Sequence, residues 1–114
     1  MSRGWIGVDL DGTLVKYGDG AFHPAKVGEP IPAMLERVKD WLDAGIQVKV
    51  FTARVSSSSA MREEARAAIT AWTLKHLGVE LEVTAEKDYG MIELWDDRAI
   101  QVEHNTGRIL SIME

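Results

Sequence analysis

The chain has 114 residues, a formal net charge of −5 at pH 7 and no cysteine. This length predicts one domain over residues 1–114, and the 46% hydrophobic content is enough for a packed core. The lack of cysteine excludes disulfides, thiolate metal sites and thiol nucleophiles, and is compatible with a cytoplasmic location. The acidic charge argues against nucleic acid as a partner. No apolar run is long enough for a membrane helix or a signal peptide.

Short apolar segments alternate with amphipathic ones in the first half of the chain. Trp5 to Leu10 is short and largely apolar, which predicts a strand buried on both faces. The next segment, Gly12 to Gly28, is rich in turn residues. A helix is predicted to begin at Pro30–Pro32 and to end at Gly45. A second strand is predicted from Ile46 to about Thr52.

The second half continues this alternation. Ser56 to Ser59 is interpreted as a polar loop that ends in a helix N-cap, and the helix is predicted over Met61 to His76, with Gly78 as its stop. Further strands are predicted around Leu81 and Val83, Ile92 and Leu94, and Ile100 and Val102. Residues 105–107 are typical of a turn before a last apolar segment, Ile109 to Met113.

Strands that alternate with helices predict an α/β fold: a three-layer, Rossmann-like parallel sheet with helices on both faces. Ligands bind such sheets at the carboxyl ends of the strands. Polar residues stand at each of these predicted ends: Asp9, Asp11, Thr52, Asp96 and Asp97. We therefore expect these side chains to gather at one edge of the sheet.

Asp9 and Asp11 form the most informative pair. They follow an apolar strand, and a persisting strand pleat would point both carboxylates the same way. Such close carboxylates repel each other and need a cation, for which Mg²⁺ is the natural candidate. A helix-loop-helix calcium site is excluded, because the twelfth position of a loop begun at Asp9 is Gly20 rather than a glutamate.

The remaining candidates are weak one by one. Thr52 could hold a phosphoryl oxygen together with nearby backbone N–H groups, such as those of Gly12 and Ala53, but alone it is a plain turn threonine. Arg54 is a candidate for contact with a substrate anion, since a guanidinium binds phosphate through two N–H groups. Lys87, taken alone, is a solvated lysine. Their joint occurrence in chain order with the acidic residues raises their significance.

Together these segments resemble the haloacid dehalogenase-like (HAD) hydrolase superfamily. Val8–Leu14 is similar to the first motif of that family, and Leu94–Arg98 to the paired-acid form of the fourth. Thr52 and Lys87 match the single residues of the second and third motifs. The resemblance spans the chain from about Trp5 to Val102 and implies a minimal HAD core that lacks a cap domain.

The resemblance implies a role for each of these residues. Asp9 would attack phosphorus and form an aspartyl-phosphate, and Asp11 would act as general acid and then as base. Thr52 and Lys87 would hold the transferring phosphoryl group. The ligands of Mg²⁺ would be Asp9, the backbone carbonyl of Asp11, Asp96, and Asp97 either directly or through water.

Two departures from the family pattern qualify these expectations. About eight residues separate the third and fourth predicted strands, which is near the lower limit for a parallel crossover, so the usual helix there is expected to be missing. The position of Lys87 relative to the expected site depends on this link. Capless members often act on large substrates or use a neighbouring subunit as a lid. A homo-oligomer is therefore one of the alternatives for this chain.

Three functions compete at this stage. The first is a Mg²⁺-dependent phosphatase acting on a phosphorylated substrate. The second is phosphotransfer to another acceptor, or removal of phosphate from a nucleic-acid end. The third is a non-catalytic module that binds Mg²⁺ or a partner. The presence of Asp11 beside Asp9 argues against the third, because a pure binder needs no acid/base residue.

Overall fold

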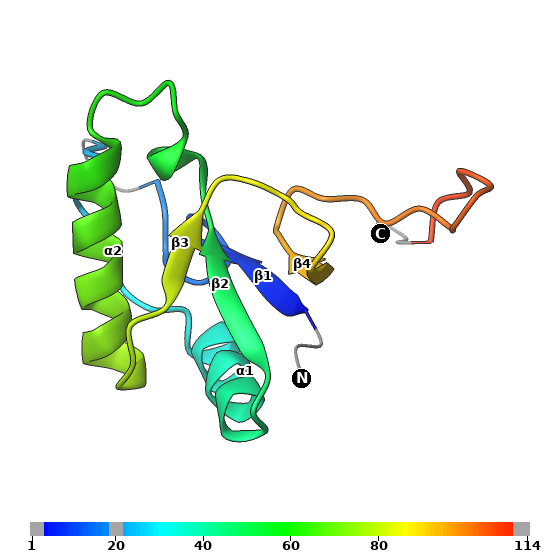
Figure 1. Ribbon diagram of the computed structural model, residues 1–114, viewed down its shortest axis with the longest axis horizontal. Helices are drawn as coiled ribbons and strands as arrows, with labels where there is room; N and C mark the ends of the chain where they lie inside the picture. The colour runs from blue at the N-terminus through cyan, green and yellow to red at the C-terminus, as the bar shows by residue number, and fades with distance from the viewer. Residues whose placement is uncertain (1–3, 19–21, 111–114) are drawn as a thin grey trace.

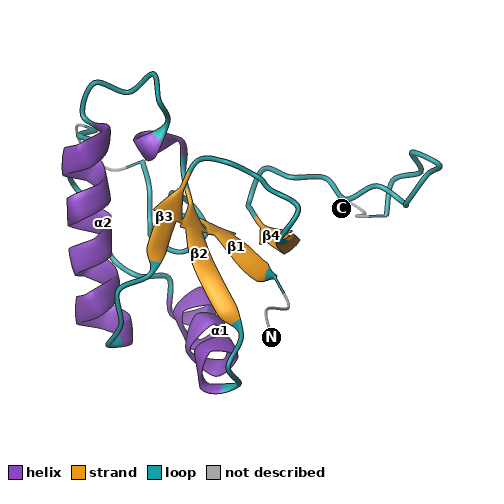
Figure 2. Cartoon of the chain, viewed as in Figure 1, coloured by secondary structure: helices purple, strands orange, loops and turns teal. Residues whose placement is uncertain are grey.

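The computed structural model describes residues 4–18 and 22–110 and shows an α/β fold (Figure 1). Its elements follow in the order β1 (Trp5–Asp9), α1 (Pro32–Asp43), β2 (Gln47–Phe51), η1 (Ala53–Val55), α2 (Arg62–Leu77), β3 (Glu82–Thr84) and β4 (Met91–Trp95). The four strands form a parallel sheet in the order β3-β2-β1-β4 (Figure 2). The predicted α/β class and parallel sheet are therefore confirmed.

The helix boundaries follow the expected signals with one exception. Pro32 is the first residue of α1, and Gly78, with φ of 79°, ends α2 in the left-handed conformation. The expected serine N-cap of α2 is wrong. Met61 occupies that position and no side chain caps the helix. The Ser56 and Ser58 hydroxyls are instead within 3.2 Å of each other, so they bond locally rather than to α2.

The main core lies on one face of the sheet. Alternate strand residues, among them Ile6, Val8, Val48, Val50 and Val83, form one buried cluster with residues of both helices. The helical members of this cluster are Met34 and Val38 of α1 and Ala65, Ile69 and Trp72 of α2. Both helices therefore cover the same face. A three-layer arrangement needs helices on both faces, and the described residues supply none on the second.

The second face is covered near β1 by the link between β3 and β4. Trp5 is only 3% exposed there, and its Nε1 donates to Asp88 Oδ1 at 2.9 Å. The ammonium group of Lys49 lies 4.5 Å from the centre of a Trp5 ring. This link contains no helix, as its short length predicts. It runs from the carboxyl end of β3 to the amino end of β4, and Asp88 and Gly90 within it bond to Trp5.

The expected fifth strand does not form within the part of the chain that the structure describes. Val102 makes a single antiparallel bridge with Ile109, and Ile100 and Val102 are both more than half exposed. The apolar alternation there has no neighbouring strand to pair with. The predicted turn at residues 105–107 is confirmed by positive φ at Asn105 and Gly107. Residues 111–113 of the predicted last apolar segment lie outside the described residues.

None of the helices within residues 4–18 and 22–110 is long and apolar enough to cross a membrane.

The consequence of the fold that matters for function lies at the carboxyl edge of the sheet. Parallel pairing of β1 with both β2 and β4 brings the ends of these three strands together. Asp9, Thr52 and Asp96 stand at those ends.

Candidate active site

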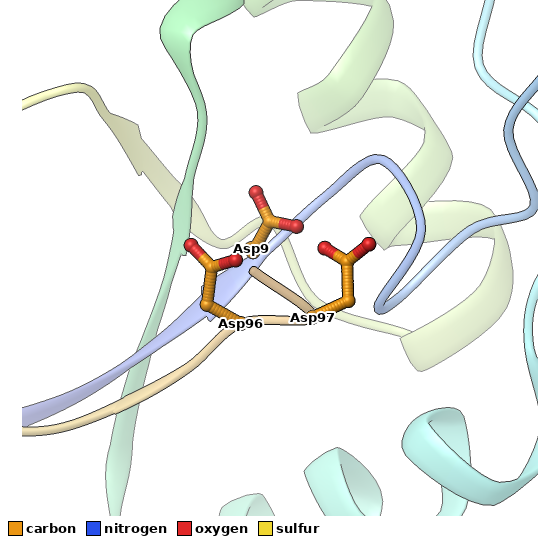
Figure 3. Close-up of side chains that lie close together, drawn as sticks. All are labelled: Asp9, Asp96 and Asp97. Atoms are coloured by element: carbon orange, nitrogen blue, oxygen red, sulfur yellow. The ribbon is translucent and has the colours of Figure 1, made fainter. Parts of the chain in front are cut away.

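Three carboxylates meet where β1 and β4 end. Asp9 is the last residue of β1, and Asp96 and Asp97 directly follow β4. The pairing of Val8 with Trp95 sets this register. One carboxylate oxygen of each residue lies within 4.8 Å of those of the other two, and Figure 3 shows the three side chains around a common space. The predicted gathering of Asp9, Asp96 and Asp97 is confirmed.

Thr13 connects this group, a role that the sequence analysis did not assign to it. Its Oγ1 is 3.1 Å from Asp9 Oδ2 and 3.2 Å from Asp97 Oδ1, and it accepts from the backbone N–H of Asp97 at 3.0 Å. The hydroxyl has one proton and can donate to one carboxylate at a time. Its position inside the Val8–Leu14 motif was the only available signal.

Gly12 makes the close approach of Asp97 sterically feasible. Its φ is +89°, and an added Cβ would lie 2.6 Å from Asp97 Oδ2. The chain turns immediately afterwards, with the N–H groups of Leu14 and Val15 both donating to the Leu10 carbonyl at 3.0 Å. Any larger residue at position 12 would push the carboxylate away. The structure thus shows a spatial role for Gly12, and its expected contact with substrate stays a prediction.

The electrostatics of the group are those of a cation site. The pKa of Asp9 is raised from an ordinary 3.8 to about 7, chiefly by burial and also by the negative charge of Asp96 and a hydrogen bond with Asp97, while a hydrogen bond with Thr13 opposes the rise. Three carboxylates offer hard oxygen donors, the ligand type that Mg²⁺ and Ca²⁺ prefer. The residues present therefore fit a hard divalent cation.

Asp11 points into a different environment from these three residues. Arg54 Nε donates to Asp11 Oδ2 at 2.9 Å and Arg54 Nη2 donates to Asp11 Oδ1 at 2.6 Å, a two-pronged ion pair. The Asp11 carboxylate is not part of the three-carboxylate group. The parallel orientation expected for Asp9 and Asp11 is therefore not observed, because the strand ends at Asp9 and the chain turns.

Arg54 is almost buried, with 8% exposure. Besides its bonds to Asp11, its Nη1 donates to the carbonyls of His23, Pro24 and Lys26 at 3.3, 2.9 and 2.6 Å. Its guanidinium is therefore largely satisfied by the chain itself. This differs from the expected free contact with a substrate anion, since a buried guanidinium first satisfies nearby carbonyls and carboxylates.

Thr52 and Ala53 line the same cavity as the carboxylates. Thr52 is 4% exposed, and its Oγ1 accepts from the Arg54 N–H at 3.2 Å, which leaves its hydroxyl proton available to a ligand. The cavity has a volume of about 430 Å³. Its lining comprises Asp9, Asp11, Tyr17, Phe22, Pro24, Thr52, Ala53, Arg54, Ser59, Asp96, Asp97 and Arg98.

Lys87 is not brought to this cavity. It lies exposed on the link between β3 and β4 and is absent from the cavity lining. Arg98, in contrast, lines the cavity, and its backbone N–H donates to Asp96 Oδ1 at 2.8 Å. Arg98 belongs to the segment Leu94–Arg98 that is similar to the fourth HAD motif, but no role was expected of it. The phosphate-binding role expected of Lys87 stays a prediction.

Comparison of the chain with protein-family models, with curated proteins and with solved structures found no significant match.

Proposed function

We propose that the chain is a Mg²⁺-dependent phosphatase that hydrolyses a phosphate monoester through an aspartyl-phosphate on Asp9. The observation that carries the proposal is the group of three carboxylates at the carboxyl edge of the sheet. Beside it lie a second aspartate, Asp11, and a buried hydroxyl, Thr52, in one cavity. This is the set of groups that in-line phosphoryl transfer requires: a nucleophile, an acid/base and positioned charge.

Asp9, Asp96 and Asp97 would hold the cation, with the backbone carbonyl of Asp11 as a further candidate ligand. When bound, Mg²⁺ supplies positive charge that offsets both the carboxylates and the negative charge of the phosphoryl group. The residues Thr13 and Gly12 keep the carboxylates close together without a ligand. Such support from surrounding residues commonly sets metal affinity.

In the first step, a carboxylate oxygen of Asp9 attacks phosphorus. A bond forms between that oxygen and phosphorus, and the bond from phosphorus to the leaving oxygen breaks. Asp11 gives a proton to the leaving oxygen, which departs as an alcohol. Since both Asp11 oxygens accept hydrogen bonds from Arg54, the proton transfer requires Asp11 to exchange part of that contact. The Thr52 hydroxyl donates to a phosphoryl oxygen.

In the second step, water attacks phosphorus and Asp11 takes a proton from it. The bond between phosphorus and the Asp9 oxygen breaks, which restores Asp9 and releases inorganic phosphate. Both steps use one acid/base residue in its two protonation states, so the cycle closes without another reactant.

Membership of the HAD superfamily, which the sequence resembles, is part of this proposal. The chain would be a minimal, capless form of the HAD core in which an extended link replaces the helix before β4. The site would then be open toward solvent on the side where larger members carry a cap. Phosphotransfer to another acceptor and a non-catalytic Mg²⁺-binding module stay as alternatives that the experiment must separate.

The test combines turnover with detection of the phosphoenzyme. We expect hydrolysis of an aryl phosphate with Mg²⁺, loss of turnover with excess chelator and recovery on adding Mg²⁺. Asp9→Asn should lose turnover entirely, because an amide is a very poor nucleophile. Asp11→Asn should still be phosphorylated by a substrate with a good leaving group, and should lose roughly 10²- to 10⁴-fold in turnover.

Intact mass measurement after rapid quenching checks the covalent step. A mass increase on the Asp11 variant and none on the Asp9 variant is the expected pattern. Asp43→Asn, an exposed carboxylate at the end of α1, is the matched control and should behave like the wild type. Phosphate transferred to an added alcohol instead of water would favour the phosphotransferase. Mg²⁺ binding without any turnover or phosphoenzyme would favour the binding module.

A further inference from the structure

A second cavity adjoins the proposed active site and shares part of its wall. It has a volume of about 430 Å³ and is lined by residues of the segment after β1 together with Arg54. Its lining comprises Lys16, Tyr17, Gly18, Phe22, His23, Lys26, Val27, Gly28, Glu29 and Arg54. Tyr17, Phe22 and Arg54 also line the cavity that contains the carboxylates. The two aromatic side chains therefore stand between the two spaces.

Tyr17 and Phe22 are unusually exposed for aromatic residues beside a cavity. Each has 57% of its surface exposed, and their rings meet edge-on at 6.4 Å with an interplanar angle of 70°. Arg54 lies 4.8 Å from the centre of the Phe22 ring. A cation–π contact of this kind holds the ring in place. With this exposure, the two rings offer an apolar surface on which a ligand ring can stack.

Hydrogen bonds to residues near Tyr17 and Phe22 hold the wall that carries these rings. The Lys16 N–H donates to the Glu29 carbonyl at 2.8 Å, and Trp72 Nε1 donates to the Gly28 carbonyl at 3.1 Å. Arg54 Nη1 binds the Pro24 and Lys26 carbonyls from below. A preformed site loses less entropy on binding than a loose one.

Charge in the second cavity also differs from that of the first. Lys16 and Lys26 are exposed, and among the residues that the structure describes they form no ion pair and share the lining with a single carboxylate, Glu29. The Arg54 charge is already matched by Asp11. The second cavity thus suits a ligand that combines a planar ring with an anionic group.

We propose that Tyr17 and Phe22 form a leaving-group subsite, and that the substrate is a phosphate monoester whose alcohol carries a nucleobase or a similar planar ring. The phosphoryl group would lie beside Asp9 while the ring stacks on the aromatic pair. Lys16 and Lys26 would contact a further anionic group of the same substrate. The substrate class is therefore nucleotide-like. This inference rests on the proposed phosphatase function.

The experiment compares kcat/KM for substrates with and without a ring. The ring arms are an aryl phosphate, a nucleoside monophosphate and a dinucleotide with a terminal phosphate. The ringless arms are glycerol phosphate and a sugar phosphate. We expect the dinucleotide to be the best substrate, since only it offers a ring and an additional phosphate. If instead the dinucleotide and the nucleoside monophosphate are hydrolysed equally well, the lysines have no role and that part of the inference fails.

Variants then assign the preference to the aromatic pair. Tyr17→Ala and Phe22→Ala should each lower kcat/KM for ring substrates by about 5- to 100-fold, and for ringless substrates by less than about twofold. Tyr17→Phe keeps the ring and should retain the preference. Phe22→Leu keeps an apolar cover over Arg54 and serves if Phe22→Ala does not fold. Tyr89→Ala removes an exposed tyrosine that lines neither cavity and is the control. An equal loss for all substrates would overturn the inference, because the rings would then only support Arg54.

A binding measurement separates this inference from the proposed function. Saturation-transfer NMR with adenosine, which has no phosphate, should show ring contact with the wild type and reduced contact with Tyr17→Ala. If no monoester is hydrolysed but this difference is seen, the ring subsite stands and the phosphatase proposal fails. If monoesters are hydrolysed but neither variant changes adenosine contact or ring preference, the subsite is wrong and the phosphatase stands.

Discussion

Thr13 is the residue whose role depends most on its surroundings. A threonine after Asp-Gly is an ordinary turn residue. Here its hydroxyl contacts the carboxylate of Asp9, four positions earlier, and both the carboxylate and the backbone N–H of Asp97, 84 positions later. The distances of 3.0–3.2 Å are those of ordinary hydrogen bonds. It therefore positions Asp9 and Asp97 relative to each other.

Replacing Thr13 with valine keeps the shape of the side chain and removes the hydroxyl. We expect Mg²⁺ affinity to fall by roughly 10-fold, the usual cost of losing a residue that supports a metal ligand. Thr13→Ser keeps the hydroxyl and should bind Mg²⁺ nearly as well as the wild type. Calorimetric titration of both variants measures the difference. Equal affinity for the valine and serine variants would show that the carboxylates need no such support.

Arg54 acts at the scale of elements, because one side chain joins three segments. Arg54 lies in η1. Its guanidinium donates to the carboxylate of Asp11, just after β1, and to three carbonyls within residues 23–26. The carbonyls of His23, Pro24 and Lys26 all face this one guanidinium, and the His23 carbonyl also accepts from the Lys26 N–H at 2.9 Å. Arg54 therefore holds residues 23–26 of the wall between the two cavities, while Lys16 and Trp72 bond to Glu29 and Gly28 farther along it.

Arg54→Gln should destabilise the protein by about 3 kcal/mol, because it leaves a half-buried carboxylate and several carbonyls without their partner. Arg62→Gln is the matched control: its side chain is 47% exposed, and we expect a change of less than about 0.5 kcal/mol. Urea denaturation measures both. Limited proteolysis should also cut faster after Lys26 in the Arg54 variant. An Arg54 variant as stable as the control would mean that other contacts hold this segment.

At the scale of the whole molecule, the carboxylate group sets how stability depends on pH. The pKa of Asp9 is raised to about 7 in the folded protein, mainly by burial, against 3.8 in an unfolded chain. Between these values the folded state binds the proton more tightly than the unfolded state. The free energy of unfolding therefore falls as pH rises from about 4 to about 7 when no divalent cation is present.

Urea denaturation in chelator at about pH 5 and about pH 8 tests this dependence. Bound Mg²⁺ should remove most of the loss, because it stabilises the ionised carboxylates. Asp9→Asn carries no titrating group at this position, so its stability in chelator should change less over the same range. If the wild type becomes more stable toward about pH 8 in chelator, the raised pKa of Asp9 is contradicted.

Much of the fold was predictable because its signals are local. The period of apolar residues identified both helices and the strands β1 to β4, and glycines marked the helix ends. The local sequence signals predicted the wrong structure where the outcome depends on a second segment of the chain. The alternation at Ile100 and Val102 suits a strand, but no neighbouring strand is there to pair with it. The serines before α2 suit a cap, but they bond locally instead.

The sequence by itself determined which residues stand at the ends of strands, and hence that Asp9, Asp96 and Asp97 would meet, because parallel strands end at a common edge. Only the tertiary structure decided where each side chain points after the strand ends. There the pleat no longer sets direction, so Asp11 turned to Arg54 rather than to Asp9. Contacts across the chain likewise decided that Thr13 joins the carboxylates and that Lys87 stays outside the cavity. These outcomes depend on long-range packing and charge pairing, which no local pattern encodes.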